Sequence, residues 1–245
     1  MSRTNNTIQS FWVIFGSLAG FVFVTASSMF LSRYFNKIDY GTFKQVTFTY
    51  STLLAVFTLG LPKAYSFFLP RVPKSEAKDV ISKINNILIT CGFFFSLVIF
   101  FGSDLIAMLL KNAALSSLLK WFSLVPLFML PTMGLEGILA TYKKTRILAF
   151  YNITTKCLLF LCITLPVILF NGGLKHAIIG FTVSSFISFV IAMILKYNPV
   201  KQEDKEKSSY SYNDLFKYSL PIMLASIWGM IITSTDQFMI SRYFG

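Results

Sequence analysis

Apolar residues run along the chain in long stretches that short polar connections separate. Seven stretches reach the length of about 20 mostly apolar residues that a helix needs to cross a bilayer. The pattern predicts an all-α membrane protein, built as a six-helix transmembrane bundle and the first helix of a second bundle. The seven predicted spans cover residues 8–31, 42–61, 84–110, 118–141, 147–170, 174–195 and 218–240.

The composition agrees with a lipid environment. Of the 245 residues, 55% are hydrophobic and only 13% are charged, and the mean hydropathy is +0.65. A soluble domain carries about 25% charged residues, so this chain has too little polar surface to cover a globule in water. A soluble enzyme, a disordered chain and a secreted disulfide scaffold are therefore excluded as classes.

The basic residues predict the orientation in the membrane. With a cytoplasmic N-terminus, the inner connections carry 14 lysines and arginines and the outer ones carry 7. Cytoplasmic loops are enriched in these residues, so we expect the N-terminus in the cytoplasm. The net charge of +12 is then explained by topology and by anionic membrane lipids as partners, and nucleic acid is not an expected partner.

One clearly hydrophilic stretch begins at Lys196 and shows no apolar periodicity, which is typical of a flexible linker. It divides the chain into three parts. Residues 1–195 are interpreted as the six-helix bundle, 196–216 as a charged cytoplasmic linker and 217–245 as the first helix of a truncated C-terminal bundle.

The last predicted span repeats features of the first. The tetrapeptide SRYF occurs at residues 32–35 and again at 241–244, and at the same offset of 209 residues Gly20 corresponds to Gly229. We expect both helices to cross in the same direction, as in transporters with two parallel six-helix halves. A second span follows the first copy only, so we expect a fragment of a protein about twice as long.

Residues with catalytic or metal-binding chemistry are few. Cys91, Cys157 and Cys162 lie inside apolar runs without metal-ligand spacing, and the single histidine, His176, cannot build a metal cluster. The sequence contains no Walker loop, GxSxG or HExxH motif. We therefore expect no catalytic residue, no metal, no cofactor and no enzymatic activity.

Several short motifs occur in a fixed order along the spans. Asp39-Tyr40-Gly41 ends an outer loop, Leu59-Gly60-Leu61 closes the second span, a basic hairpin covers 142–146, and Asp236 precedes an Arg-Tyr-Phe-Gly ending. With the topology, this arrangement resembles the bacterial polysaccharide flippases. These form the O-antigen and capsule branch of the superfamily that also holds the multidrug and toxin extrusion exporters. The resemblance covers the whole chain, but only the N-terminal half of a family member.

The resemblance implies translocation of undecaprenyl-pyrophosphate-linked oligosaccharide across the bacterial cytoplasmic membrane by alternating access. It further implies a proton or sodium ion as coupling ion and an association with polysaccharide polymerase machinery. Two other functions stay open. A multidrug and toxin extrusion-type exporter would want a carboxylate deep in the first span, which has none. An integral-membrane glycosyl- or acyltransferase would need clustered acids or histidines at the membrane face.

Two charges lie deep in the predicted spans. A charge near mid-bilayer costs at least about 2.5–3.5 kcal/mol, so each is a functional candidate. At a rise of 1.5 Å per residue, Lys156 lies about 15 Å and Glu136 about 10 Å from the same side. Either the two form an ion pair, or Lys156 faces a cavity and attracts the lipid pyrophosphate. In the second case Glu136 is a proton site or a partner that releases Lys156.

Three further charges lie nearer the outer side. Asp236 is interpreted either as part of a local polar arrangement or as a gating or ion-coupling carboxylate between the two halves. Arg33 and Lys44 lie at the outer ends of the first two spans. Snorkelling to the interface explains them, and the alternative is that they line the outward mouth and bind the pyrophosphate.

Overall fold

The computed structural model describes residues 3–204 and 206–243, with the backbone alone for 3–6 and 241. Helices and their connections make up this part of the chain, and it contains no strand. The helices are α1 (Arg3–Tyr34), α2 (Lys37–Phe57), α3 (Leu61–Phe68), α4 (Lys74–Leu109), α5 (Ala113–Phe122), α6 (Leu124–Thr132), α7 (Leu135–Thr141), α8 (Thr145–Leu169), α9 (Leu174–Tyr197) and α10 (Tyr212–Tyr243), with short 3-10 turns η1 (Leu69–Arg71) and η2 (Asn198–Val200).

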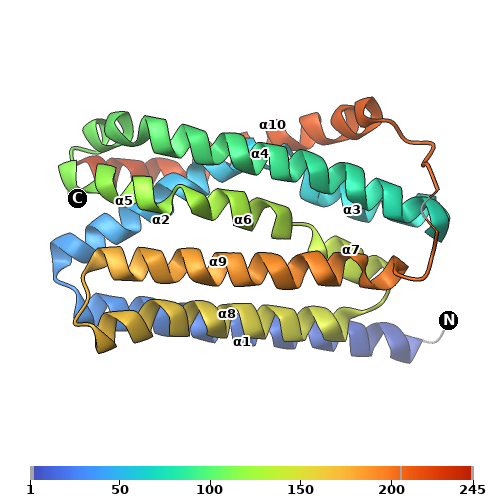
Figure 1. Ribbon diagram of the computed structural model, residues 1–245, viewed down its shortest axis with the longest axis horizontal. Coiled ribbons are helices and arrows are strands. Elements are labelled where there is room, and N and C mark those ends of the chain that lie inside the picture. Colours follow the sequence, from blue (N-terminus) through green and yellow to red (C-terminus); the bar gives the residue numbers. More distant parts are fainter. Residues whose placement is uncertain (1–2, 205, 244–245) are drawn as a thin grey trace.

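The helices run along one common long axis (Figure 1). α1 packs on α8, α8 on α9 and α9 on α6, and α6 packs in turn on α4, while α10 lies against α2. One end of the bundle carries the N-terminus and the connection from α9 to α10, and is called the linker end below. The opposite end carries the α1–α2 and α8–α9 connections and the C-terminus, and is called the far end.

The helix lengths confirm the all-α membrane fold. Within the described residues, 6 helical segments are long and apolar enough to cross a membrane, and a bent pair formed by α2 and α3 raises the number to 7. The apolar pattern predicts five of these segments as unbroken helices, namely α1, α4, α8, α9 and α10. The chain is therefore a multi-pass membrane protein.

The second predicted span is broken rather than continuous. α2 ends at Phe57, and α3 starts at Leu61 with a bend of 47° between the two helices. Gly60 has a φ of +68°, a left-handed conformation that favours glycine. A Cβ at this position would lie 2.5 Å from the carbonyl oxygen of Ser219 in α10. The break therefore lets the backbone of α10 approach closely.

The fourth predicted span is also broken. It consists of α5, α6 and α7, and α6 ends one residue after Pro131, which occupies its last turn. Gly134 follows with a φ of +80°, and a Cβ there would overlap the ring of Tyr65 in α3. Pro126 lies in the first turn of α6, where proline is tolerated, whereas Pro131 lies directly before the break. Pro166 lies inside α8, which continues to Leu169.

Small residues hold α1 against α8. A Cβ at Gly16 would lie 2.7 Å from the Cα of Ala149, and a Cβ at Gly20 would lie 3.3 Å from the Cγ of Lys156. The two glycines are four residues apart and therefore share one face of the helix. This is the close packing expected of a small-xxx-small pair in a membrane.

The linker, interpreted from the sequence as flexible, makes specific contacts at the linker end. The carboxylate of Asp79 accepts hydrogen bonds from the backbone N–H and the hydroxyl of Ser208, both at 3.0 Å, and forms an ion pair with Lys83 at 2.8 Å. Lys83 also donates to the carbonyl oxygen of Tyr210 at 2.8 Å. Polar side chains of α4 therefore fix a segment that has no apolar pattern of its own.

The two helices that carry the predicted repeat run in the same direction, from the linker end to the far end (Figure 1). Each spans 32 residues within the described part of the chain. Their surroundings differ, because Gly20 packs on α8 whereas a Cβ at the corresponding Gly229 would meet open space. The parallel direction agrees with the expectation from the sequence.

Candidate functional site

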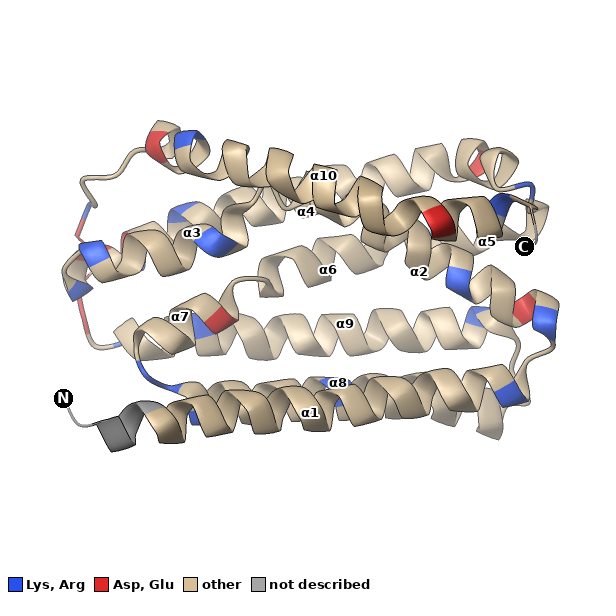
Figure 2. Ribbon diagram, turned by 180° about the vertical axis from the view of Figure 1, so that it is seen from behind, with Lys and Arg blue, Asp and Glu red and all other residues tan. Residues whose placement is uncertain are grey.

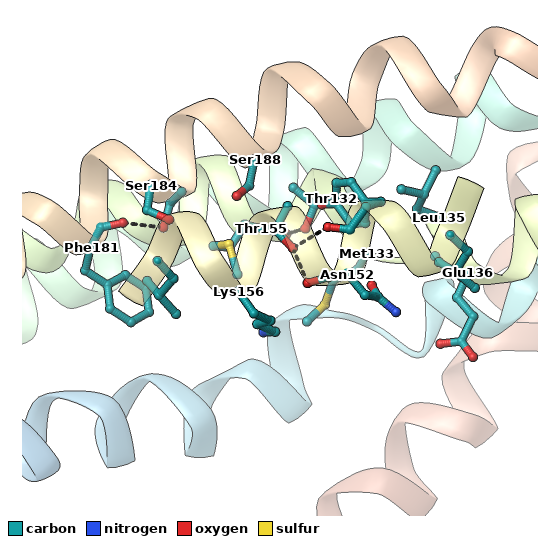
Figure 3. Close-up of a pocket in the computed structure, with 16 residues that line it drawn as sticks. Thr132, Met133, Leu135, Glu136, Asn152, Thr155, Lys156, Phe181, Ser184 and Ser188 are labelled. Carbon is teal, nitrogen blue, oxygen red and sulfur yellow. Dashed lines mark hydrogen bonds between the residues drawn. The ribbon is translucent and has the colours of Figure 1, made fainter. Parts of the chain in front are cut away.

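A cavity of about 380 Å³ lies among α6, α7, α8 and α9 (Figure 3). Its volume falls within the range of about 300–1,000 Å³ that is typical of small-molecule sites. The break at Met133 and Gly134 forms part of its wall, because α6 ends there and no continuous helix fills the space. The other walls come from single faces of α8 and α9.

One face of α8 supplies the charge of this cavity. Asn152, Thr155, Lys156 and Leu159 line it, and their spacing of three, four and seven residues places them on one side of a helix. The stem of Lys156 crosses the surface of α1 at Gly20, where a larger residue would crowd it. A glycine in the neighbouring helix therefore allows this lysine to lie between α1 and α8 and reach the cavity.

Hydroxyl groups line the wall of the cavity that α9 forms. Ser184, Ser185 and Ser188 of α9 line the cavity, and all three are buried. The hydroxyl of Ser185 donates to the carbonyl oxygen of Phe181 at 2.8 Å, and that of Thr155 donates to the carbonyl oxygen of Tyr151 at 2.9 Å. The hydroxyls of Ser185 and Thr155 therefore donate within their own helices and add neutral polar groups to the lining.

Glu136 lines the same cavity but does not pair with Lys156. Among the described residues these two side chains form no ion pair. Figure 3 shows Glu136 at the start of α7, with Asn152 and Met133 between it and Lys156. Glu136 lies in the first turn of α7, and its side chain is exposed. The structure therefore does not form the Glu136–Lys156 ion pair that the sequence offered as one of two alternatives.

Lys44 lies in a second, smaller cavity of about 230 Å³, which is formed by α1, α2, α8 and α9. Its ammonium group lies 3.5 Å from the hydroxyl oxygen of Ser28 and 5.2 Å from the ring centre of Tyr40. Both neighbours are neutral. The sequence places Lys44 at the helix end, whereas the structure directs it toward the interior of the bundle.

The remaining two predicted site residues lie elsewhere. Arg33 is exposed and borders a shallow depression at the far end with Met29, Phe30 and Tyr34. Asp236 is exposed on α10 and lines neither of the two cavities described above. Figure 2 shows that charged residues gather toward the two ends of the bundle, with few along its middle. The structure thus brings together Lys156 and Glu136 but not the other candidates.

A buried charge that the sequence analysis missed lies at the linker end. Lys196 is fully buried, and its ammonium group donates to the hydroxyl oxygen of Tyr65 at 3.1 Å and to the side-chain oxygen of Asn85 at 3.2 Å. It thereby joins α9 to α3 and α4. Lys196 lies four residues after Ala192 and so on the same face of α9, whereas the sequence analysis interprets it as the first residue of the hydrophilic linker.

Taken together, the fold and the cavity define a multi-pass α-helical membrane protein with a cation inside the bundle. Comparison with known families agrees with this class, because residues 4–245 match the family described as polysaccharide biosynthesis protein. The match covers nearly the whole chain, and the chain belongs to this family. Searches of curated proteins and of solved structures found no match.

Proposed function

We propose that this chain forms part of a transporter, rather than an enzyme, that moves undecaprenyl-pyrophosphate-linked oligosaccharides across the bacterial cytoplasmic membrane. The observation that carries the proposal is the position of Lys156 in a cavity inside the bundle, without a carboxylate in ion-pair contact among the described residues. Family membership supports a role in polysaccharide biosynthesis. An anionic head group is the natural counter-charge for such a lysine.

The energetics favour binding of an anion. Placing a charged side chain at mid-bilayer costs at least about 2.5–3.5 kcal/mol, so such a residue is by default a candidate for a functional role. At a separation of 4 Å and an effective dielectric constant of 20, a unit anion attracts the ammonium group by about 4 kcal/mol. Desolvation of both groups offsets part of this gain. A diphosphate carries more than one negative charge and therefore gains more than a neutral sugar does.

The direction and coupling of transport follow from the same proposal. The excess of basic residues in one set of connections supports a cytoplasmic N-terminus, so in this proposal the linker end faces the cytoplasm and the far end faces outward. Transport proceeds by alternating access, and α10 would contact a second bundle through its largely exposed surface. Glu136 at the cavity and Asp236 on α10 are the proposed sites for a proton or sodium ion. The transporter would also associate with the polysaccharide polymerase machinery.

The experiment is complementation of a flippase-deficient strain by the whole gene product. The Lys156→Gln variant should lose most surface polysaccharide at normal protein levels. The Lys175→Gln variant is the matched control, because Lys175 is exposed at the start of α9. Full export by the Lys156→Gln variant would refute the role of this lysine. A failure of the wild-type protein to restore polysaccharide in any such strain would refute the transport function.

A further inference from the structure

One face of α8 and one face of α9 line both the Lys156 cavity and the Lys44 cavity. Leu159 of α8 and Phe181 of α9 line both cavities. Lys156, Leu159 and Ile163 follow one another at positions i, i+3 and i+7, so α8 presents one continuous stripe to both spaces. The cavities are therefore neighbours, and the side chains of Leu159 and Phe181 separate them.

The second cavity has the chemistry of an anion site. Lys44 supplies the positive charge, and no acidic side chain of the described chain lies within ion-pair distance of it. Ser27, Ser28 and Thr47 add hydroxyl groups to the lining. Since Ser28 is a neutral acceptor for the lysine, an arriving anion can replace it without breaking an ion pair. The volume of about 230 Å³ suits a head group rather than a complete oligosaccharide.

The second cavity lies farther than the first along the proposed transport path, which runs from the linker end to the far end. Ser184 and Ser188, which line the first cavity, follow Phe181 on α9, and α9 runs from the far end to the linker end. Lys44 lies in the first half of α2, which starts at the far end. The second cavity is thus nearer the far end than the first.

We propose that the Lys44 cavity is a second station for the diphosphate group, reached from the Lys156 cavity past the partition formed by Leu159 and Phe181. This inference rests on the proposed function and adds an intermediate position to it. The partition is held on one side, because the ring of Phe181 packs against Phe122 with centroids 5.2 Å apart. Leu159 is an aliphatic side chain with rotamer freedom and would be the part that moves.

The test uses thiol protection in the whole gene product in nanodiscs, with all native cysteines, including Cys91, Cys157 and Cys162, replaced by alanine. An Asn152→Cys variant reports on the first cavity and a Thr47→Cys variant on the second. Each thiol reacts with a small maleimide, alone and with polyprenyl diphosphate or inorganic pyrophosphate. Protection by either ligand supports a diphosphate site, and their comparison shows whether the anion is recognised alone or with its lipid chain.

The diphosphate ligand should slow maleimide labelling of both the Asn152→Cys and the Thr47→Cys thiols by at least about tenfold. An added Lys44→Gln substitution should abolish protection of the Thr47→Cys thiol and leave the Asn152→Cys thiol protected. An unprotected Thr47→Cys thiol beside a protected Asn152→Cys thiol would overturn the second station and leave the proposed function standing. Absence of protection at both positions, in protein that remains folded, would refute diphosphate binding altogether. Protection at Thr47→Cys that survives Lys44→Gln would also overturn the role of this lysine.

Discussion

Replacing Asp79 with alanine should release the linker from the end of α4. In the structure Asp79 is only 8% exposed, and its carboxylate receives two hydrogen bonds from Ser208 and an ion pair from Lys83. The substitution removes all three interactions and leaves the N–H of Ser208 without its acceptor. Lys83 keeps its contacts with the hydroxyl of Ser208 and the carbonyl of Tyr210, so it is not left unpaired.

The magnitude follows from these contacts. A hydrogen bond to a charged group contributes about 1.5–3 kcal/mol, so the two bonds from Ser208 together contribute at least about 3 kcal/mol. Since about 1.4 kcal/mol corresponds to a factor of ten, local opening of the linker should become at least about 100-fold more frequent. The native bundle should persist, because these hydrogen bonds join α4 to the linker and not one membrane-spanning helix to another.

Hydrogen–deuterium exchange measured by mass spectrometry tests this directly. A peptide covering 206–211 should exchange at least about 100-fold faster in the Asp79→Ala variant, whereas peptides from α8 and α9 should not change. The control is Glu76→Ala, whose hydrogen bonds to Ser209 lie at exposed surface and should contribute less than about 1 kcal/mol. Unchanged exchange of the linker peptide in the Asp79→Ala variant would refute the docking of the linker.

Three further predictions concern the bundle. Gly16→Val should lower the free energy of unfolding by about 1–3 kcal/mol through overpacking against Ala149. The control is Gly229→Val, whose side chain would point into open space. Equal melting temperatures of the two variants would contradict the close packing at Gly16. Lys196→Ala should lower the free energy of unfolding by about 2–5 kcal/mol, because it leaves a cavity and two buried acceptors without their donor. Lys175→Ala, the control, should leave the free energy of unfolding almost unchanged. An unchanged thermal unfolding of the Lys196→Ala variant would contradict the buried contacts. Phe181→Ala should let maleimide reach the Thr47→Cys thiol faster, whereas Phe186→Ala should not; equal labelling rates would contradict the partition.

The spans could be predicted from the sequence because their apolar runs are long and depend on length and composition alone. α1, α8 and α9 begin and end within a few residues of the predicted limits. The breaks in the second and fourth spans could not be placed in the same way. Gly60 and Gly134 adopt positive φ and are closely approached by α10 and by the ring of Tyr65, and these contacts join segments far apart in the chain.

The candidate site could be predicted only in part. Lys156 was identifiable because its depth depends on helix rise, and the structure places it at a cavity. Glu136 was identified by the same counting, yet its orientation depends on the break before α7. Lys196 was missed, since composition marks where a linker begins but not that the preceding helix end is covered by α3 and α4.

The central claim is that Lys156 binds the diphosphate of a lipid carrier inside the bundle. The most direct measurement is the affinity of the whole gene product in nanodiscs for polyprenyl diphosphate, determined by native mass spectrometry. We predict that Lys156→Gln weakens binding at least about tenfold, a loss of about 1.4 kcal/mol out of the attraction expected for one contact, and that Lys175→Gln binds like the wild type. Equal affinity of the folded Lys156→Gln variant and the wild type would contradict the claim.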